Sequence, residues 1–233
     1  AKLALSTVDN ILSVLNAAMN RAFQVQLIKQ NPIPKCTLAE FTNQRPKTRA
    51  TKVTHKLLIS TIRGLPKRKI EHQLLFSLLI MHGTRIGETV NAKWEAFDFK
   101  ERLWRIPAQD TKTKQAHILP ITTQTYTLLK RYKRHQAIQG KSVYLFPQKQ
   151  NRRNPISANQ GSSILSTLAS KQWSAHDCRK FARTTWLDQD VDFMIGELII
   201  NHKIPDVSSK YLHSTAEKQK IAALTHYHKY LFS

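Results

Sequence analysis

Apolar residues recur at every third or fourth position along much of this 233-residue chain, and this spacing limits the fold more than any other feature. A repeat of about 3.6 residues places apolar side chains on one face of a helix. The repeat is clear in residues 7–28 and in 69–83, where Ile70, Leu74, Leu75, Leu78 and Leu79 are expected to point inward. Further helices are expected at 54–63, just after Gly83, and at 122–139, 159–170, 175–188, 191–200 and 215–231.

Three short stretches have strand patterns instead: residues 93–98, 102–107 and 116–121. Within 102–106 apolar and polar residues alternate with a period of two, as in a strand with one buried face. The fold class is therefore predicted to be mainly α with a small three-stranded antiparallel sheet. The turn between the last two strands carries Lys112 and Lys114.

The first helix stands apart from the rest of the chain. Ser6 or Thr7 is its expected N-cap, and Asn31-Pro32-Ile33-Pro34 is expected to stop it. One helix cannot bury its own apolar stripe, so residues 1–35 are interpreted as the last helix of a domain truncated upstream. Residues 36–53 contain Pro46 and four bases from Arg45 to Lys52, which is typical of a basic linker. Residues 54–233 are expected to form one domain.

The charge of the chain points to a polyanionic partner. Lys and Arg total 37 against 15 Asp and Glu, a formal net charge of +22. Residues 111–174 contain 11 basic residues and no carboxylate. A merely solubilising surface would interleave acids with the bases, whereas a surface that contacts phosphates would not. Nucleic acid is therefore the expected partner.

Several other classes of protein are disfavoured. No apolar run approaches the roughly 20 residues of a membrane-spanning helix. Two cysteines, Cys36 and Cys178, are too few for a disulfide framework, and a reducing compartment fits them best. The C-terminal third contains several histidines without a cysteine pair or an HExxH motif, so no metal site is expected; they are His202, His213, His226 and His228.

Candidate reactive residues occur as pairs that are weak evidence one at a time. Arg85 and Glu88 lie three residues apart, as do His176 and Arg179. Such pairs share a helix face. By itself the first is more typical of an ordinary salt bridge at a helix start, and the second is equally typical of a helix-surface pair. Lys112 by itself is typical of a solvated lysine, and His202 and Tyr211 of packed core residues.

Together and in this order, the residues resemble the tyrosine site-specific recombinases, the integrases of phages and genomic islands. The similarity rests on His82-Gly83-Thr84-Arg85-Ile86-Gly87-Glu88, Asp110-Thr111-Lys112-Thr113-Lys114, His117-Ile118-Leu119-Pro120-Ile121, His176-Asp177-Cys178-Arg179, Asn201-His202 and Tyr211-Leu212-His213. It covers about residues 50–230. The resemblance implies the catalytic-domain fold of that family for residues 54–233, and the end of its core-binding domain for residues 1–35.

The resemblance implies a role for each residue of the set. Two guanidiniums, Arg85 and Arg179, would stabilise the charge that builds on the phosphate oxygens, since arginine binds such oxygens without losing its proton. Tyr211 would be the nucleophile and His176 the general base, because a tyrosine hydroxyl has a pKa near 10. Three further roles are implied: His202 as a donor to a phosphate oxygen, Lys112 as the acid for the 5′-hydroxyl leaving group, and Glu88 as the group that holds an arginine or histidine in place. The product would be a 3′-phosphotyrosine, which conserves bond energy and requires neither ATP nor a metal.

The chain departs from the family pattern at the residue before the second histidine, where Asn201 replaces the usual Gly or Ala. Asn could crowd this turn, although it tolerates unusual backbone angles. Cys178 and Phe181 also replace commoner residues. Tyr227 and Tyr230 are only fallback nucleophiles, because they lie on the predicted last helix in a packing stripe with Ile221, Leu224 and Leu231. The last helix could pack on its own domain or dock onto a neighbouring protomer.

The implied function is a DNA strand-breaking and rejoining enzyme that integrates or excises a mobile element. Its partner would be double-stranded attachment-site DNA, bound as a tetramer, with a monomer as the alternative for this length of chain. The expected location is the bacterial host cytoplasm, at the nucleoid. The alternatives are a type IB topoisomerase, a non-catalytic DNA-binding protein of the same fold and an RNA-binding protein. The residues expected to contact DNA are Lys114, Lys130, Arg131, Lys133, Arg134, Arg152 and Arg153.

Overall fold

The computed structural model describes residues 3–33, 36–45, 50–202 and 216–232. The chain divides into two compact units, Ala1–Ala50 and Thr51–Ser233. Tyr211 and His213 lie outside the described residues.

The first unit is built on one helix, α1 (Leu5–Gln24), and a 3₁₀ turn at Leu38–Glu40. None of the residues of α1 is buried, and Phe23 on its apolar stripe is 49% exposed. This agrees with the expectation that a single helix cannot bury its own apolar stripe. The side chain of Asn16 bonds the backbone of Cys36 in both directions and so ties the helix to the following segment.

Both predicted ends of α1 were wrong. The helix begins one residue before Ser6, with Ala4 at the N-cap and no side-chain cap. It ends well before Pro32, because Gln26 adopts a left-handed conformation (φ 57°). The amides of Gln26 and Leu27 then bond the carbonyls of Phe23 and Ala22, which completes a Schellman turn. A local C-cap, and not the proline, therefore terminates the helix.

The second unit contains the remaining elements. They are α2 (His55–Gly64), α3 (Ile70–His82), α4 (Ile86–Val90), β1 (Phe97–Asp98), β2 (Leu103–Ile106), β3 (His117–Pro120), α5 (Thr123–Gln139), α6 (Ala158–Leu168), α7 (Ala175–Asp188), α8 (Phe193–Ile199) and α10 (Ala216–Leu231). The predicted class, mainly α with a small three-stranded antiparallel sheet, is confirmed. The predicted span of α7, 175–188, agrees at both ends, and a capping box of Ser174 and Asp177 fixes its start.

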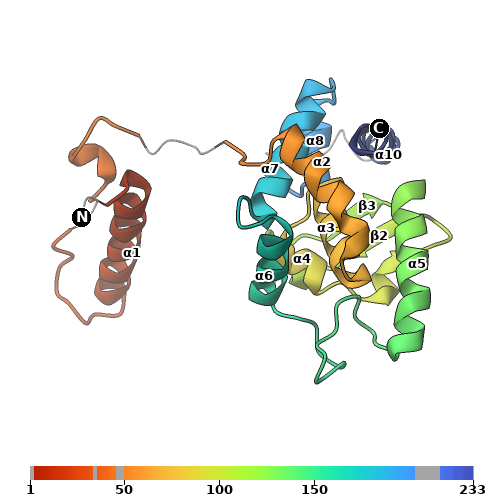
Figure 1. Cartoon of the computed structure of the whole chain (residues 1–233). Helices are drawn as coiled ribbons and strands as arrows, with labels where there is room; N and C mark the ends of the chain where they lie inside the picture. Colours follow the sequence, from red (N-terminus) through yellow and green to blue (C-terminus); the bar gives the residue numbers. More distant parts are fainter. Residues whose placement is uncertain (1–2, 34–35, 46–49, 203–215, 233) are drawn as a thin grey trace. The chain divides into compact units, whose positions relative to one another are not determined.

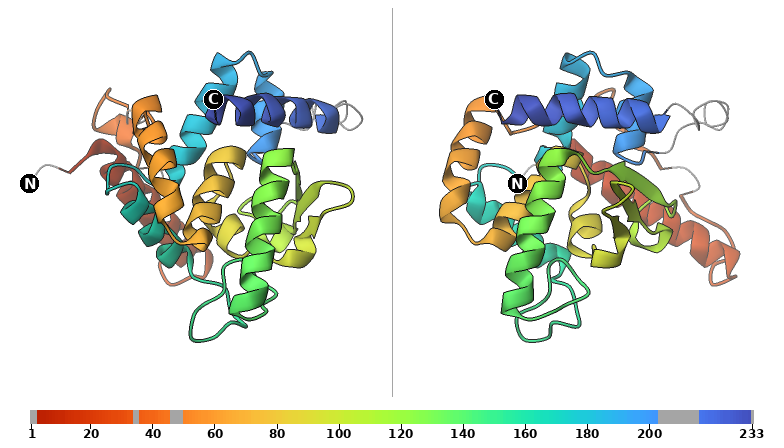
Figure 2. Two further views of the ribbon diagram at one scale, coloured as in Figure 1. Left: turned by 45° about the vertical axis from the view of Figure 1, so that its right-hand side comes forward. Right: turned by 90° about the vertical axis from the view of Figure 1, so that its right-hand side faces the viewer.

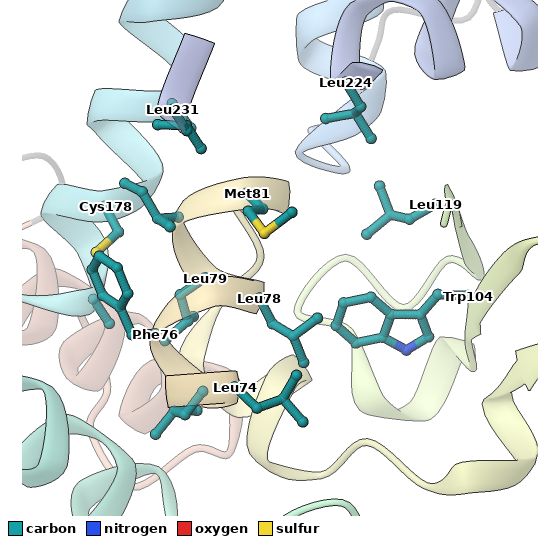
Figure 3. Close-up of a cluster of buried hydrophobic side chains, with 14 of the residues drawn as sticks. Leu74, Phe76, Leu78, Leu79, Met81, Trp104, Leu119, Cys178, Leu224 and Leu231 are labelled. Carbon is teal, nitrogen blue, oxygen red and sulfur yellow. The ribbon is translucent and has the colours of Figure 1, made fainter. Parts of the chain in front are cut away.

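The central helix of this unit is α3, with α7 and α5 packed on opposite sides of it (Figure 1). Every residue from Leu74 to His82 is buried, so the expected single inward stripe was too narrow. In Figure 3, Leu78 points towards Trp104 of the sheet, whereas Phe76 lies beside Cys178 of α7. Burial of about 150–250 Å² by each large aromatic makes such contacts a main source of stability.

The sheet has the order β1-β2-β3, with antiparallel neighbours. Trp104 pairs with Leu119 of β3 and with Phe97 of β1. The first strand is shorter than the predicted 93–98, because a 3₁₀ turn occupies Trp94–Ala96. The stacked rings of Phe97 and Trp104, 5.0 Å apart, hold the short strand in register.

Helix α10 packs on α3, α7, α8 and β3 of its own chain, and it crosses over this end of the unit (Figure 2). Of the alternatives for this helix, the structure has the packing in cis. Tyr227 is fully buried, and its hydroxyl donates to the carbonyl of Ile80 at 2.9 Å. It is therefore a packing residue, and its fallback assignment as nucleophile was wrong. Ile221, by contrast, is 43% exposed and does not belong to the buried stripe.

Two features that the sequence disfavoured are absent from the described residues. Among the described residues, no helix has the length and apolar character needed to cross a membrane. Within the same residues, no three His, Cys, Asp or Glu side chains gather in a way that could hold a metal ion. Of the clustered histidines, His228 is buried and bonds protein atoms through both ring nitrogens.

Candidate active site

The first arginine of the set lies in the connection between α3 and α4. Gly83 ends α3 in the left-handed conformation (φ 61°), and a Cβ at this position would come within 3.2 Å of Ile200 and Trp186. Arg85 follows as the N-cap of α4. The carboxylate of Glu88, whose side chain is 1% exposed, bonds the backbone amide of Arg85 at 2.9 Å and its guanidinium at 2.8 Å. The guanidinium is thus fixed and one-quarter exposed.

The second arginine, Arg179, is buried on α7. Its guanidinium donates to the carbonyls of Gly83 (2.7 Å) and Ile200 (2.5 Å). Burial, and then the positive charge of Arg85, lowers the pKa of Arg179 to about 10, so it is still protonated at neutral pH. Because main-chain carbonyls orient this guanidinium without neutralising it, the two arginines form a positively charged site suited to an anion.

His202 follows α8 and is held by a carboxylate. Its Nδ1 lies 2.7 Å from Oε2 of Glu197, while Nε of Arg183 donates to Oε1 of the same carboxylate at 2.6 Å. Hydrogen bonding and the charges of these two partners hold the pKa of Glu197 below its usual range, although partial burial opposes this. The ionised carboxylate fixes the ring so that Nε2 is left for an outside partner.

Asn201 is the left-handed residue of the turn before His202. Its φ is 53°, its amide bonds the Leu198 carbonyl, and the amide of His202 bonds the Glu197 carbonyl. These are the two bonds of a Schellman turn, in which Gly is preferred and Asn is the common alternative. The expected crowding at this position is therefore absent, because Asn adopts the angles the turn requires.

His176 is exposed at the second residue of α7. Partial burial and the charges of Lys180 and Arg179 lower its pKa. The ring is therefore neutral at pH 7 and able to accept a proton. The N-terminus of α7 is fastened to the start of the unit, since the Thr51 hydroxyl donates to the Asp177 carbonyl and the Lys52 amide to its carboxylate.

Lys112 is exposed in the connection between β2 and β3, residues 107–116, called the Lys112 loop below. The loop is longer than a tight turn and contains a 3₁₀ turn, Ala108–Asp110. Thr111 is buried, and its hydroxyl lies within 3.0 Å of the carbonyls of Ala108 and Gln115, which closes the loop on itself. The fold thus brings Arg85, His176, Arg179 and His202 to one site and places the Lys112 loop near it.

Comparison with known proteins agrees with this geometry. The phage integrase family matches residues 50–218. The chain belongs to the phage integrase family. The resemblance seen in the sequence is therefore confirmed for the family.

Two integrases are related in sequence over part of their length. The integrase of Enterobacteria phage P4 is 25% identical over 168 residues, which cover 63% of this chain and 37% of the relative. The prophage integrase IntA of Escherichia coli K12 is 22% identical over 167 residues, or 71% of this chain and 39% of the relative. The match thus spans less than two-fifths of the length of either relative.

Solved recombinase structures share the fold. The Tn1549 transposon integrase in complex with circular intermediate DNA has a TM-score of 0.65 at 18% identity, over 90% of this chain and 75% of that one. A lambda integrase dimer bound to a COC′ core site has a TM-score of 0.63 at 15% identity, over 88% and 74%. At these identities the likeness establishes the fold, which is that of a tyrosine recombinase catalytic domain.

The basic residues predicted to contact DNA have different environments in this chain. Lys130, Arg131, Lys133 and Arg134 are exposed on α5, as are Lys114 and Arg153 in loops. The ammonium groups of Lys130 and Lys133 lie over aromatic rings on or beside α5. Arg152 is half-buried and donates to the carbonyl of Gly140, so it also closes the end of α5. Contact of these residues with DNA stays a prediction.

Glu197 and Arg183 are site residues that the sequence reasoning did not assign. The available signal was an acid inside the otherwise apolar segment 193–200, five residues before His202. Contact between Glu197 and Arg183 depends on how α7 packs on α8, which no local pattern reveals.

A cavity of about 640 Å³ lies elsewhere in this unit, between α3, α5 and α6. Its lining includes Glu71, Tyr132, Arg152 and Gln160 and none of the predicted catalytic residues. The predicted catalytic residues therefore lie outside this cavity.

Proposed function

We propose that this chain is the catalytic part of a site-specific DNA recombinase that integrates or excises a mobile element through a 3′-phosphotyrosine intermediate. One observation carries the proposal: Arg179 is positively charged and is oriented by the carbonyls of Gly83 and Ile200, beside Arg85. Two fixed guanidiniums bordered by His176 and His202 suit the oxygens of one phosphodiester.

In the proposed cleavage step the Tyr211 hydroxyl attacks phosphorus and loses its proton to His176. The P–O5′ bond breaks, and the departing 5′-oxygen receives a proton from Lys112. Arg85, Arg179 and His202 stabilise the charge on the non-bridging oxygens; a single arginine in related phosphoryl transfer accounts for about 10³–10⁵ in rate. The new phosphotyrosine bond replaces the one broken, so the reaction is reversible by the 5′-hydroxyl of a second strand and requires neither ATP nor a metal.

Further parts of the proposal concern the whole protein. The partner is double-stranded attachment-site DNA in the bacterial cytoplasm, and the working assembly is a tetramer on two duplexes. The lambda and Tn1549 integrases with this fold were solved on DNA, which supports a DNA partner. The net charge of +22 supports the same partner. Residues 1–35 are proposed to be the end of a core-binding domain, and 36–53 its linker.

The test is covalent capture on DNA. The protein is incubated with nicked duplexes that carry a randomised core, so that the 5′ fragment released by cleavage diffuses away and traps the enzyme. Adducts that survive detergent are recovered and sequenced, which also supplies the core site for later experiments. We expect adducts with the natural chain and none with Tyr211→Phe. Adducts that persist in Tyr211→Phe would overturn the assignment of the nucleophile.

Two further outcomes separate the alternatives. Relaxation of supercoiled plasmid without preference for any sequence would favour a type IB topoisomerase. Salt-sensitive binding to DNA with no adduct, both for this chain and for a longer chain with a complete core-binding domain, would favour a non-catalytic DNA-binding protein.

A further inference from the structure

The turn that carries His202 contacts more of the site than His202 alone. Residues 197–202, called the His202 turn below, supply the Ile200 carbonyl to Arg179 and the Glu197 carboxylate to His202 itself. A third contact leaves this turn from Asn201. Its side-chain amide donates to the hydroxyl of Thr113, in the Lys112 loop, at 3.0 Å.

The contact between Asn201 and Thr113 joins segments 88 residues apart. Asn201 is 8% exposed, and Thr113 is half-buried. Thr113 in turn lies 3.5 Å from Thr111, the residue that closes the loop on itself. Lys112 is therefore placed between a threonine fixed within the loop and a threonine fixed to the His202 turn, although its own side chain is exposed.

The backbone of the turn does not require an Asn side chain. A Schellman turn is satisfied by Gly in the left-handed position, at lower conformational cost. Neither Gly nor Ala has a polar group that could reach Thr113. The amide of Asn201 thus adds something that the turn does not need for its own geometry: a fixed distance between the Lys112 loop and the residues that hold the phosphate.

We propose that Asn201 is a positioning residue, which docks the Lys112 loop on the His202 turn through Thr113 so that Lys112 reaches the leaving 5′-oxygen. This inference rests on the proposed function, since it assigns Lys112 as the acid of the cleavage step. Without the dock, Lys112 would sample many positions, and protonation of the 5′-oxygen would become slow. General acid catalysis of this kind contributes about 10²–10⁴ in rate.

The chain offers matched variants for the test. Asn201→Gly removes the amide and keeps the left-handed turn, and Thr113→Val removes the hydroxyl and keeps the shape of the side chain. Thr113→Ser keeps the hydroxyl and serves as the control. The rate at which each variant cleaves the captured core site is compared with that of the natural chain. Thermal unfolding is also measured, and we expect the midpoint temperatures to differ by no more than a few degrees.

A second substrate distinguishes positioning from general damage. It carries sulfur in place of the bridging 5′-oxygen at the cleaved bond; the thiolate leaves without a proton. On the normal substrate we expect Asn201→Gly and Thr113→Val to be slowed about 10- to 100-fold, with the double variant no slower than either, and Thr113→Ser to be within about threefold of the natural chain. On the sulfur substrate all should cleave within about threefold of the natural chain, as should Lys112→Ala. Equal slowing on both substrates, or none on either, would overturn the proposal.

A separate readout needs no cleavage of DNA. Trypsin cuts after lysine, and Lys112 and Lys114 are both exposed in the loop. If Asn201 docks the loop, Asn201→Gly and Thr113→Val should be cut there severalfold faster than the natural chain, and Thr113→Ser should not. Unchanged cutting rates would refute the dock even for a chain that forms no adduct. Failure of the natural chain to cleave either substrate would instead count against the proposed function, and the trypsin result would still stand.

Discussion

Two groups of histidines in this chain have opposite surroundings. His176 and His202 are exposed at the site, beside arginines and, for His202, a carboxylate. His82 and His228 are buried where α10 packs on α3, with their rings 5.3 Å apart. Burial lowers the pKa of His82 to about 3 and that of His228 to about 4.

In the buried group, His228 has a partner at each ring nitrogen. One nitrogen of His228 lies 2.8 Å from the Met81 carbonyl and the other 2.8 Å from the Thr122 hydroxyl. A neutral ring satisfies both contacts by donating to the carbonyl and accepting from the hydroxyl. The same residue type thus supports packing in one region and, in the proposed mechanism, contacts the reacting groups in the other; exposure to solvent separates the two.

The largest expected effect is at the site. Arg179→Lys keeps a positive charge. Its ammonium group lacks the planar set of donors with which the guanidinium can bond the carbonyls of Gly83 and Ile200 and bind a phosphate at the same time. We expect adduct formation to slow by about 10²–10³-fold in single-turnover assays. Arg63→Lys, an exposed arginine on α2, is the control and should be unchanged. A rate within tenfold of the natural chain would show that Arg179 only supports the fold.

The next effect is at the buried group. His228→Ala leaves a cavity and removes the partner of Thr122, so we expect the free energy of unfolding to fall by about 3 kcal/mol. Urea unfolding followed by circular dichroism measures it. His226→Ala, an exposed histidine two residues away, should change stability by less than about 0.5 kcal/mol. Equal effects of the two substitutions would remove the distinction between the two groups.

The buried histidines also predict sensitivity to acid. Burial lowers the pKa of His82, His117 and His228 to between about 3 and 4, from 6.5 in the unfolded chain. Their contribution to stability is complete above about pH 6.5. It is lost as pH falls towards the folded values, because the unfolded chain then binds more protons. Each site contributes a slope of up to about 1.4 kcal/mol per pH unit.

Urea midpoints measured between pH 7 and 5 test this prediction, since most carboxylates stay ionised there. We expect the midpoint to fall steadily below pH 6.5. A midpoint that stays level down to pH 5 would mean that these rings are protonated inside the fold.

The smallest expected effect concerns the carboxylate that holds His202. Glu197→Gln keeps the shape but removes the charge that orients His202 and Arg183. We expect cleavage to slow about tenfold, with little change in the urea midpoint. Glu217→Gln, at an exposed acid on α10, is the control. If the two variants cleave DNA at the same rate, the carboxylate has no role in orienting His202.

Patterns that span only a few neighbouring residues predicted much of this structure. The N-cap Ser174 marked the start of α7, and the apolar period located α3. The same reasoning failed for the ends of α1, where the left-handed Gln26 stops the helix before Pro32. It also failed to predict that Tyr227 is buried, because the burial of this side chain depends on how α10 packs on α3.

The sequence by itself determined the helices, the small sheet, the basic character and the ordered set of reactive residues, since each depends on residue type and near neighbours. Only the tertiary structure decided what holds those residues. Arg179 is oriented by carbonyls 96 and 21 residues away, and Asn201 reaches a threonine 88 residues away. Contacts over such separations depend on helix packing, which no local pattern encodes.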